Sequence, residues 1–134
     1  MRVFLDTNVL VGAFASRGLC ADLFEVVLLE HELITGNGVL RELRRALQQK
    51  IRLPKRHCDQ IVEFVQGAAA NRVQSSSPIR APVDPDDAAI LGEALSGESD
   101  LFVTGDAAVQ QLALLGRMRI LSPRSFWDLL HSGA

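Results

Sequence analysis

Near the amino terminus lies the stretch Val3-Phe4-Leu5-Asp6-Thr7-Asn8-Val9-Leu10, an apolar run interrupted by polar residues. Residues 3–5 predict a short buried strand, and the run breaks at Asp6 and Asn8. An acid at the carboxyl end of a strand lies on the ligand-binding edge of an open α/β sheet. The stretch therefore predicts such a sheet, with Asp6 at that edge.

The rest of the chain alternates strands with helices, which favours a parallel sheet covered by helices on both faces, an α/β fold. The expected strands are 3–5, 32–35, 71–74, 101–104 and 119–121. The expected helices are 9–15, 21–30, 39–49, 55–69, 84–95, 107–115 and a last one capped by Ser122 and Pro123. Residues 36–38 predict a turn and 75–82 a loop, while Phe64 is expected to point inward from helix 55–69.

Composition indicates an ordinary globular protein with one domain, residues 1–134, because 48% of the residues are hydrophobic and 22% are charged. Cys20 and Cys58 have no metal or redox spacing, which favours a reducing compartment, so we expect a cytoplasmic protein. The amino terminus lacks the pattern of a signal peptide. No apolar run approaches the roughly 20 residues that span a membrane.

Charge is unevenly distributed although the net charge is only −2. Seven of the 14 basic residues fall between positions 41 and 56, where Glu42 is the single acid. Such a segment can meet a polyanion, or it can be a solvated helix face. The seven are Arg41, Arg44, Arg45, Lys50, Arg52, Lys55 and Arg56.

Two acids follow strands in the same way. Asp6 ends the first strand, and Asp106 follows the apolar run 101–104 after Gly105. The carboxyl ends of parallel strands meet at one edge, so the two side chains are expected to lie close together. The alternative for each is a helix N-cap, a position that aspartate favours.

Two further acids lie on expected helices. Asp84 already explains the cap of helix 84–95, whereas Asp87 lines up with Leu91 and Ala94 and so heads the apolar stripe. Burying an unpaired carboxylate costs several kcal/mol, so Asp87 requires a partner. Glu42 flanks the apolar face of helix 39–49, and its alternative is a surface salt bridge to a neighbouring arginine.

Four carboxylates gathered at one edge repel each other unless a cation joins them. Hard divalent cations such as Mg²⁺ and Mn²⁺ prefer oxygen ligands, and they promote attack on phosphodiesters. We expect Asp6, Asp87 and Asp106 to hold the metal and Glu42 to complete the shell or orient the attacking water. The histidines show no metal spacing and are expected to be surface or hydrogen-bonded residues; they are His31, His57 and His131.

The order of these motifs resembles the PIN-domain family, most closely its VapC-like toxins of bacterial toxin–antitoxin systems. The resemblance rests on residues 4–9, Glu42, the run 84–87 and the run 103–106, and it covers nearly the whole chain. It implies a three-layer α/β/α fold with a central parallel sheet. The chain departs from many members at Ala88, where they carry another acid.

The resemblance also implies a function, that of a Mg²⁺- or Mn²⁺-dependent RNA endonuclease acting as the toxin of a type II pair. The matching acids are Asp6, Glu42, Asp87 and Asp106, supported by the polar residues Thr7, Asn8 and Thr104. Family members usually form homodimers and are inhibited by a cognate antitoxin. The arginines expected to attract RNA or the antitoxin are Arg41, Arg44, Arg45, Arg52 and Arg56.

Two other functions compete with this interpretation. A non-catalytic PIN-like module would bind RNA or a protein partner without cleaving RNA, although all four acids are present. A metal-dependent phosphatase is less well supported, because Asp6 is followed by Thr7-Asn8 where a second aspartate is usual.

Overall fold

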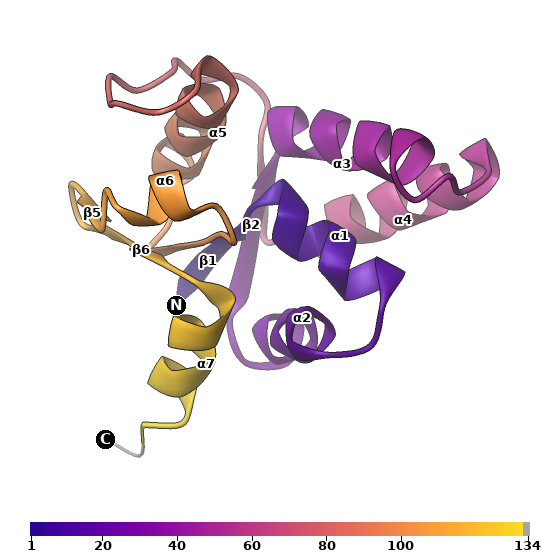
Figure 1. Ribbon diagram of the computed structural model, residues 1–134, viewed down its shortest axis with the longest axis horizontal. Coiled ribbons are helices and arrows are strands. Elements are labelled where there is room, and N and C mark those ends of the chain that lie inside the picture. Colours follow the sequence, from indigo (N-terminus) through magenta and orange to yellow (C-terminus); the bar gives the residue numbers. More distant parts are fainter. Residues whose placement is uncertain (133–134) are drawn as a thin grey trace.

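Six strands form one sheet in the computed structural model, which describes residues 1–132 (Figure 1). The strand order is β3-β2-β1-β4-β6-β5; every pairing is parallel except that of β5 with β6. The predicted α/β fold with a parallel sheet is therefore confirmed, and the antiparallel edge strand β5 is an addition that the sequence did not predict. The strands are β1 (Arg2–Leu5), β2 (Glu32–Gly36), β3 (Asn71–Val73), β4 (Leu101–Val103), β5 (Leu114–Leu115) and β6 (Met118–Leu121).

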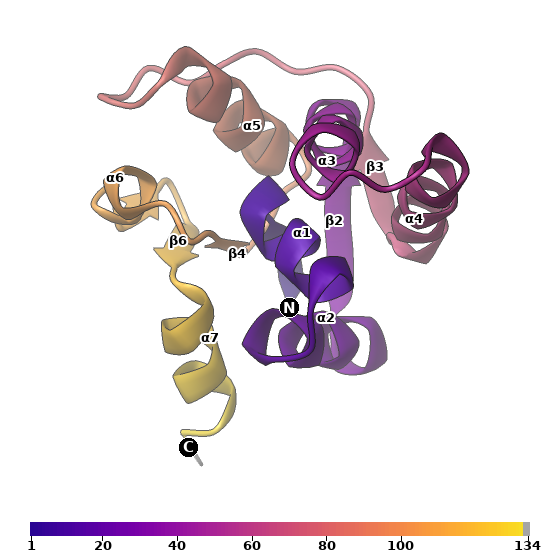
Figure 2. The same ribbon diagram turned by 45° about the vertical axis from the view of Figure 1, so that its right-hand side comes forward.

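Helices flank the sheet, and Figure 2 shows α3 at the carboxyl end of β2, from which it directly continues. Leu33 and Ile34 point to opposite faces of β2 and are at most 2% exposed, so both faces are covered there. No helix within residues 1–132 is long and apolar enough to cross a membrane. The helices are α1 (Thr7–Ala15), α2 (Leu19–Glu30), α3 (Asn37–Gln49), α4 (Lys55–Ala68), α5 (Pro85–Ser96), α6 (Ala107–Gln110) and α7 (Pro123–Leu130).

The two central strands, β1 and β4, are joined by their buried side chains as well as by backbone pairing. Phe4 lies opposite Phe102 in the register, and their rings stack with centroids 5.4 Å apart. Both rings are at most 1% exposed. Aromatic pairs of this kind stabilise beyond their buried area, so this contact helps to fix β1 beside β4.

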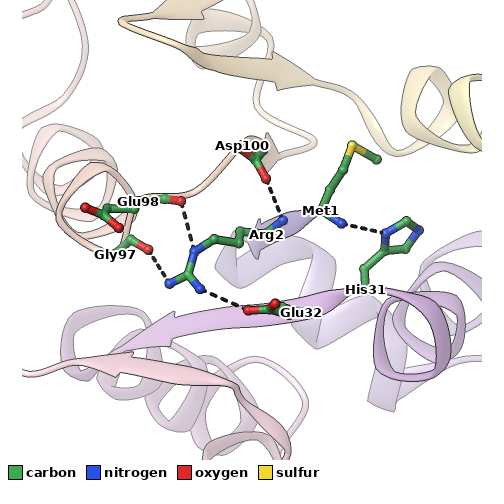
Figure 3. A network of polar contacts seen from close by, with 7 residues as sticks. All are labelled: Met1, Arg2, His31, Glu32, Gly97, Glu98 and Asp100. Carbon is green, nitrogen blue, oxygen red and sulfur yellow. Dashed lines mark hydrogen bonds and ion pairs between the residues drawn. The ribbon is translucent and has the colours of Figure 1, made fainter.

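The amino ends of the central strands are held by Arg2 (Figure 3). Its guanidinium donates to the carbonyl oxygens of Gly97 and Glu98 at 2.8 and 3.1 Å and pairs with Glu32 at 2.9 Å. Its backbone N–H donates to Asp100 Oδ2 at 2.8 Å. Arg2 therefore ties β1 to β2 and to the segment that leads into β4. This leaves the opposite, carboxyl ends of these strands at the edge where the predicted acids lie.

The expected helix 107–115 is wrong beyond its first turn. Helix α6 ends at Gln110, and residues 114–121 form a hairpin instead, in which Leu115 pairs with Met118. Gly116, the residue directly after the expected helix, has φ 57° and lies in the turn of that hairpin. Ala113 also has positive φ, 60°, so the backbone leaves the helical conformation before the hairpin begins.

Two smaller expectations are also wrong. Residues 36–38 do not form a separate turn, because Gly36 ends β2 and α3 begins directly at Asn37. Phe64 is 53% exposed, since α4 buries Cys58, Val62 and Val65 and so turns the neighbouring position outward. The Phe64 ring instead packs against the rings of Phe14 and Phe24, with centroids 6.2 Å apart in both pairs.

Candidate active site

A cleft of about 310 Å³ opens at the carboxyl edge of the sheet, where the chain order reverses between β1 and β4. Ligands of open α/β folds bind at such a switch point. The structure brings all four predicted acids into this cleft, each from a different element. The lining residues are Asp6, Thr7, Asn8, Val11, Glu42, Ala46, Lys50, Ile51, Asp87 and Asp106.

Asp6 is the most buried of the four acids, at 7% exposed. It is the N-cap of α1, and its Oδ1 accepts from the Thr7 N–H at 2.8 Å. Its Oδ2 accepts from the Thr104 hydroxyl at 2.7 Å and from Asn8 Nδ2 at 3.3 Å. Burial raises the pKa of Asp6, the hydrogen bond from Thr104 opposes that rise, and the charge of Asp106 adds to it. Asp6 is thus both a cap and a cleft residue.

The polar residues around Asp6 connect the ends of β1 and β4. Asn8 Oδ1 accepts from the Gly105 N–H at 2.9 Å, and the Thr104 hydroxyl accepts from the Asp106 N–H at 3.1 Å. Gln110, which sequence reasoning missed, donates to the Thr104 carbonyl at 2.8 Å. These bonds place the two aspartates relative to each other through backbone groups that no sequence pattern reveals.

Asp106 is the N-cap of the short helix α6. Its Oδ1 accepts from the N–H groups of Ala108 and Val109 at 2.8 and 3.3 Å. Within residues 1–132 its Oδ2 accepts no hydrogen bond, so one oxygen is available to the cleft. As with Asp6, the capping role and the position in the cleft occur together.

Glu42 extends from α3 toward the other acids and forms no ion pair with Arg41 or Arg45 in the described part of the chain. Its Oε1 accepts from the Thr7 hydroxyl at 3.4 Å. Burial raises the pKa of Glu42, and the charge of Asp6 raises it further. The alternative of a simple surface salt bridge is therefore not what the structure shows.

Asp87 lies in the first turn of α5, above Leu91 and Ala94, which are both 0% exposed. Asp84 caps this helix by accepting from the Asp86 N–H at 2.8 Å, as the sequence predicts. The pKa of Asp87 is raised to about 6, first by burial and then by the negative charges of Asp106 and Asp6. Burial and the negative charges of the neighbouring acids thus both disfavour the ionised form of Asp87.

A hard divalent cation fits the chemistry of this cleft, because its acidic donors are all carboxylate oxygens and their charges repel each other. The side chains of residues 1–132 do not, as placed, bring three or more His, Cys, Asp or Glu groups together in the geometry of a metal shell. The donor set and the raised pKa values are therefore the observations that favour a cation here.

Lys50 was not among the predicted binding residues, yet it lines the cleft. The signal was available, since Glu42, Ala46 and Lys50 are spaced four residues apart; the first two share one face of α3, and Lys50, its C-cap, continues that row. A smaller hollow of about 180 Å³ adjoins the cleft and includes Arg45 and Lys50. Arg44, by contrast, forms an ion pair with Asp59 of α4.

The raised carboxyl pKa values predict that the metal-free protein becomes less stable as pH rises from about 4 to 7. Between 3.8 and about 6 the folded protein binds more protons at Asp87 than the unfolded chain, so stability falls with rising pH. After allowance for solvent screening, we expect Asp87 to contribute about 1 kcal/mol, roughly 3–6 °C in the unfolding midpoint. Thermal melts in EDTA should show a shallower fall for Asp87→Asn. Equal pH slopes for the two proteins would contradict the prediction.

Comparison with known proteins places the chain in a family. A model of the PIN domain matches residues 2–108, whereas no curated protein sequence matches the chain. One chain of the crystal structure of VapBC2 from Rickettsia felis, bound to a DNA fragment from their promoter, has a similar fold. The two chains are 12% identical with a TM-score of 0.63, over 91% of this chain and 98% of the other. Because the family match spans most of its length, this chain belongs to the PIN domain family.

Proposed function

We propose that this protein is a metal-dependent RNA endonuclease and the toxin of a type II toxin–antitoxin pair. The observation that carries the proposal is the convergence of four acids from four separate elements in one cleft at the switch point of the sheet. Membership of the PIN domain family and the fold shared with a chain of the VapBC2 complex support it.

In the proposed site, Asp6, Asp87 and Asp106 hold Mg²⁺ or Mn²⁺, and Glu42 completes the shell or orients the attacking water. The cation, when bound, offsets charge on the phosphodiester and lowers the pKa of a water molecule. Asp6 contributes a carboxylate whose orientation is fixed by Thr104. Burial and then repulsion by Asp106 and Asp6 raise the pKa of Asp87, and a bound cation would offset that repulsion.

The proposed RNA path runs over α3 and the segment that follows it. Lys50 and Arg45 lie at the cleft and its adjoining hollow, where they can attract phosphates next to the bond that is cut. The exposed Arg41, Arg52 and Arg56 extend this basic surface. Arg44 contributes to the positive potential of the surface, although it is paired with Asp59. The same surface is proposed to attract the acidic part of the antitoxin.

The proposal includes three further properties that follow from family resemblance and composition. Residues 1–134 form a single domain, two copies form a homodimer, and the protein acts in the cytoplasm. The cysteines agree with a reducing compartment, since Cys20 and Cys58 are both free.

The decisive experiment combines RNA cleavage with thermal unfolding, in EDTA and after addition of Mn²⁺. We expect cleavage of RNA with Mn²⁺ and none in EDTA. Binding to the native state should also stabilise it by about 2.7 kcal/mol at 100 times the dissociation constant. Asp106→Asn serves as a variant with an impaired site. Undiminished cleavage in EDTA would refute the proposal, and a Mn²⁺-dependent shift without cleavage of any RNA would favour a binding module.

A further inference from the structure

Glu93 is a buried acid that lies outside the cleft. It belongs to α5, is 6% exposed, and its carboxylate accepts two backbone hydrogen bonds from α3. Oε2 accepts from the Gly38 N–H at 2.8 Å, and Oε1 accepts from the Val39 N–H at 3.1 Å. Burial raises the pKa of Glu93, while these two bonds and the charge of Arg41 oppose the rise.

These two bonds replace the usual cap of α3. An N-cap side chain ordinarily accepts from the second or third N–H of its own helix. The N-cap of α3 is Gly36, which has no side chain to do so, and the second and third N–H groups are those of Gly38 and Val39. The cap is thus supplied by Glu93, from a different helix, so it also connects the two helices.

The path of β2 into α3 is shaped around this carboxylate. A Cβ atom at Gly36 would lie 2.0 Å from Glu93 Cδ, and one at Gly38 would lie 2.8 Å from Glu93 Oε2. Both positions therefore need to be free of a side chain while Glu93 is in place. The two glycines and the Glu93 carboxylate are therefore complementary in shape, and they form a specific contact between α3 and α5.

We propose that Glu93 is a positioning residue that ties α3 to α5 and thereby holds Glu42 and Asp87 in place across the cleft. The role in the cleft rests on the proposed function. Glu42 lies one turn beyond Val39 on α3, and Asp87 lies six residues before Glu93 on α5, about 9 Å along the helix. Because a helix moves as a rigid rod over such lengths, the tie at Glu93 controls the separation of the two acids.

A double variant separates this tie from the stability of the cap. Glu93→Ala removes both the tie between the helices and the cap of α3. Gly36→Ser in the same chain then adds a hydroxyl that can cap α3 locally, in space that Glu93 vacates. Val27→Ala, a core change in α2, serves as a control of lowered stability, because Val27 is 0% exposed and not part of the cleft. Where Glu93→Ala does not fold, Glu93→Gln takes its place with Gly36 unchanged, since its amide oxygen retains one of the two acceptors and its side chain leaves no space at Gly36.

Two measurements decide the proposal. Spin labels at the exposed positions Gln48 on α3 and Ala89 on α5, in a Cys20→Ser background, report the helix separation without any metal. Electron paramagnetic resonance of free Mn²⁺ reports binding. For Glu93→Ala with Gly36→Ser we expect a broadened label distance and Mn²⁺ affinity lowered about 10-fold or more, despite recovered thermal stability. The Val27→Ala protein should show neither change.

Each outcome has a distinct meaning. A narrow label distance with wild-type Mn²⁺ affinity in the double variant would overturn the proposal and leave Glu93 as a cap alone. A broadened distance with unchanged affinity would show a tie that does not position the acids, which also overturns it. If the wild-type protein binds no Mn²⁺, the proposed function fails, and the positioning of a metal site by Glu93 fails with it, whereas the label distances still test the tie.

Discussion

Asp6→Asn is expected to lower RNA cleavage about 10³-fold while the metal-free protein remains as stable as wild type or becomes more so. Loss of an anionic ligand removes several kcal/mol of charge stabilisation at the metal, and each 1.4 kcal/mol is a factor of ten. Stability should not fall, because burial and the charge of Asp106 already disfavour the ionised form of Asp6. An amide oxygen can still accept from the Thr7 N–H, and the Thr104 hydroxyl, which donates to Asp6, can rotate to accept from the new amide N–H.

Cleavage rates in Mn²⁺ and thermal midpoints in EDTA test this expectation together. Asp128→Asn is the matched control, because it removes one negative charge from an exposed position of α7, away from the cleft. It should leave cleavage unchanged. Normal cleavage by Asp6→Asn would exclude Asp6 from the reaction. If Asp6→Asn only lowers the thermal midpoint, and Mn²⁺ does not change the midpoint of either protein, Asp6 is a structural cap.

The second large effect is expected for Gly36→Ala. The new methyl group would overlap the Glu93 carboxyl group, which lies 2.0 Å from the ideal Cβ position. Glu93 can move away only by giving up its bonds to the Gly38 and Val39 N–H groups, which would leave a buried carboxylate without partners. Overpacking and the lost charged hydrogen bonds together predict a loss of roughly 3 kcal/mol.

Urea or thermal unfolding measures this loss, and Gly67→Ala is the control. Gly67 lies exposed on α4, and nothing stands within 4 Å of its ideal Cβ position. There the same chemical change should stabilise the protein by about 0.5–1 kcal/mol, because alanine is the better helix former. A Gly36→Ala protein as stable as wild type would show that Glu93 has another place to go.

Much of the fold was predictable because its signals are local. Apolar runs marked β1 and β4, helical spacing marked α2 to α5, and Asp84 and Ser122 capped their helices as expected. The hairpin after α6 was not predictable in this way. The segment from Ala107 to Leu115 is apolar enough for a helix, and a glycine stops a helix as readily as it forms a hairpin turn.

In the candidate site, too, some residues could be predicted from local sequence signals and others could not. Asp6 and Asp106 could be found from the strands they follow, and Asp87 from its place at the head of an apolar stripe. Glu93 could not, because its partners are backbone N–H groups 54 and 55 positions away in the chain. Every residue other than proline has a backbone N–H, so such a donor cannot be recognised in the sequence. The only related signal is the pair Gly36 and Gly38, and glycines are equally typical of an ordinary turn.

The dispersal of the acids has a consequence for the synthesis of the proposed toxin. Asp6 and Asp106 are 100 positions apart, and Asp106 follows β4, which must pair with β1 to bring it to the cleft. A nascent chain therefore has no complete site at least until residue 106 has been added. At elongation rates of roughly 5–20 residues per second, the first 106 residues take about 5–20 s to make, and the proposed site is incomplete for that time. If the proposed function holds, the ribosome that makes this chain therefore meets no complete active site during that time.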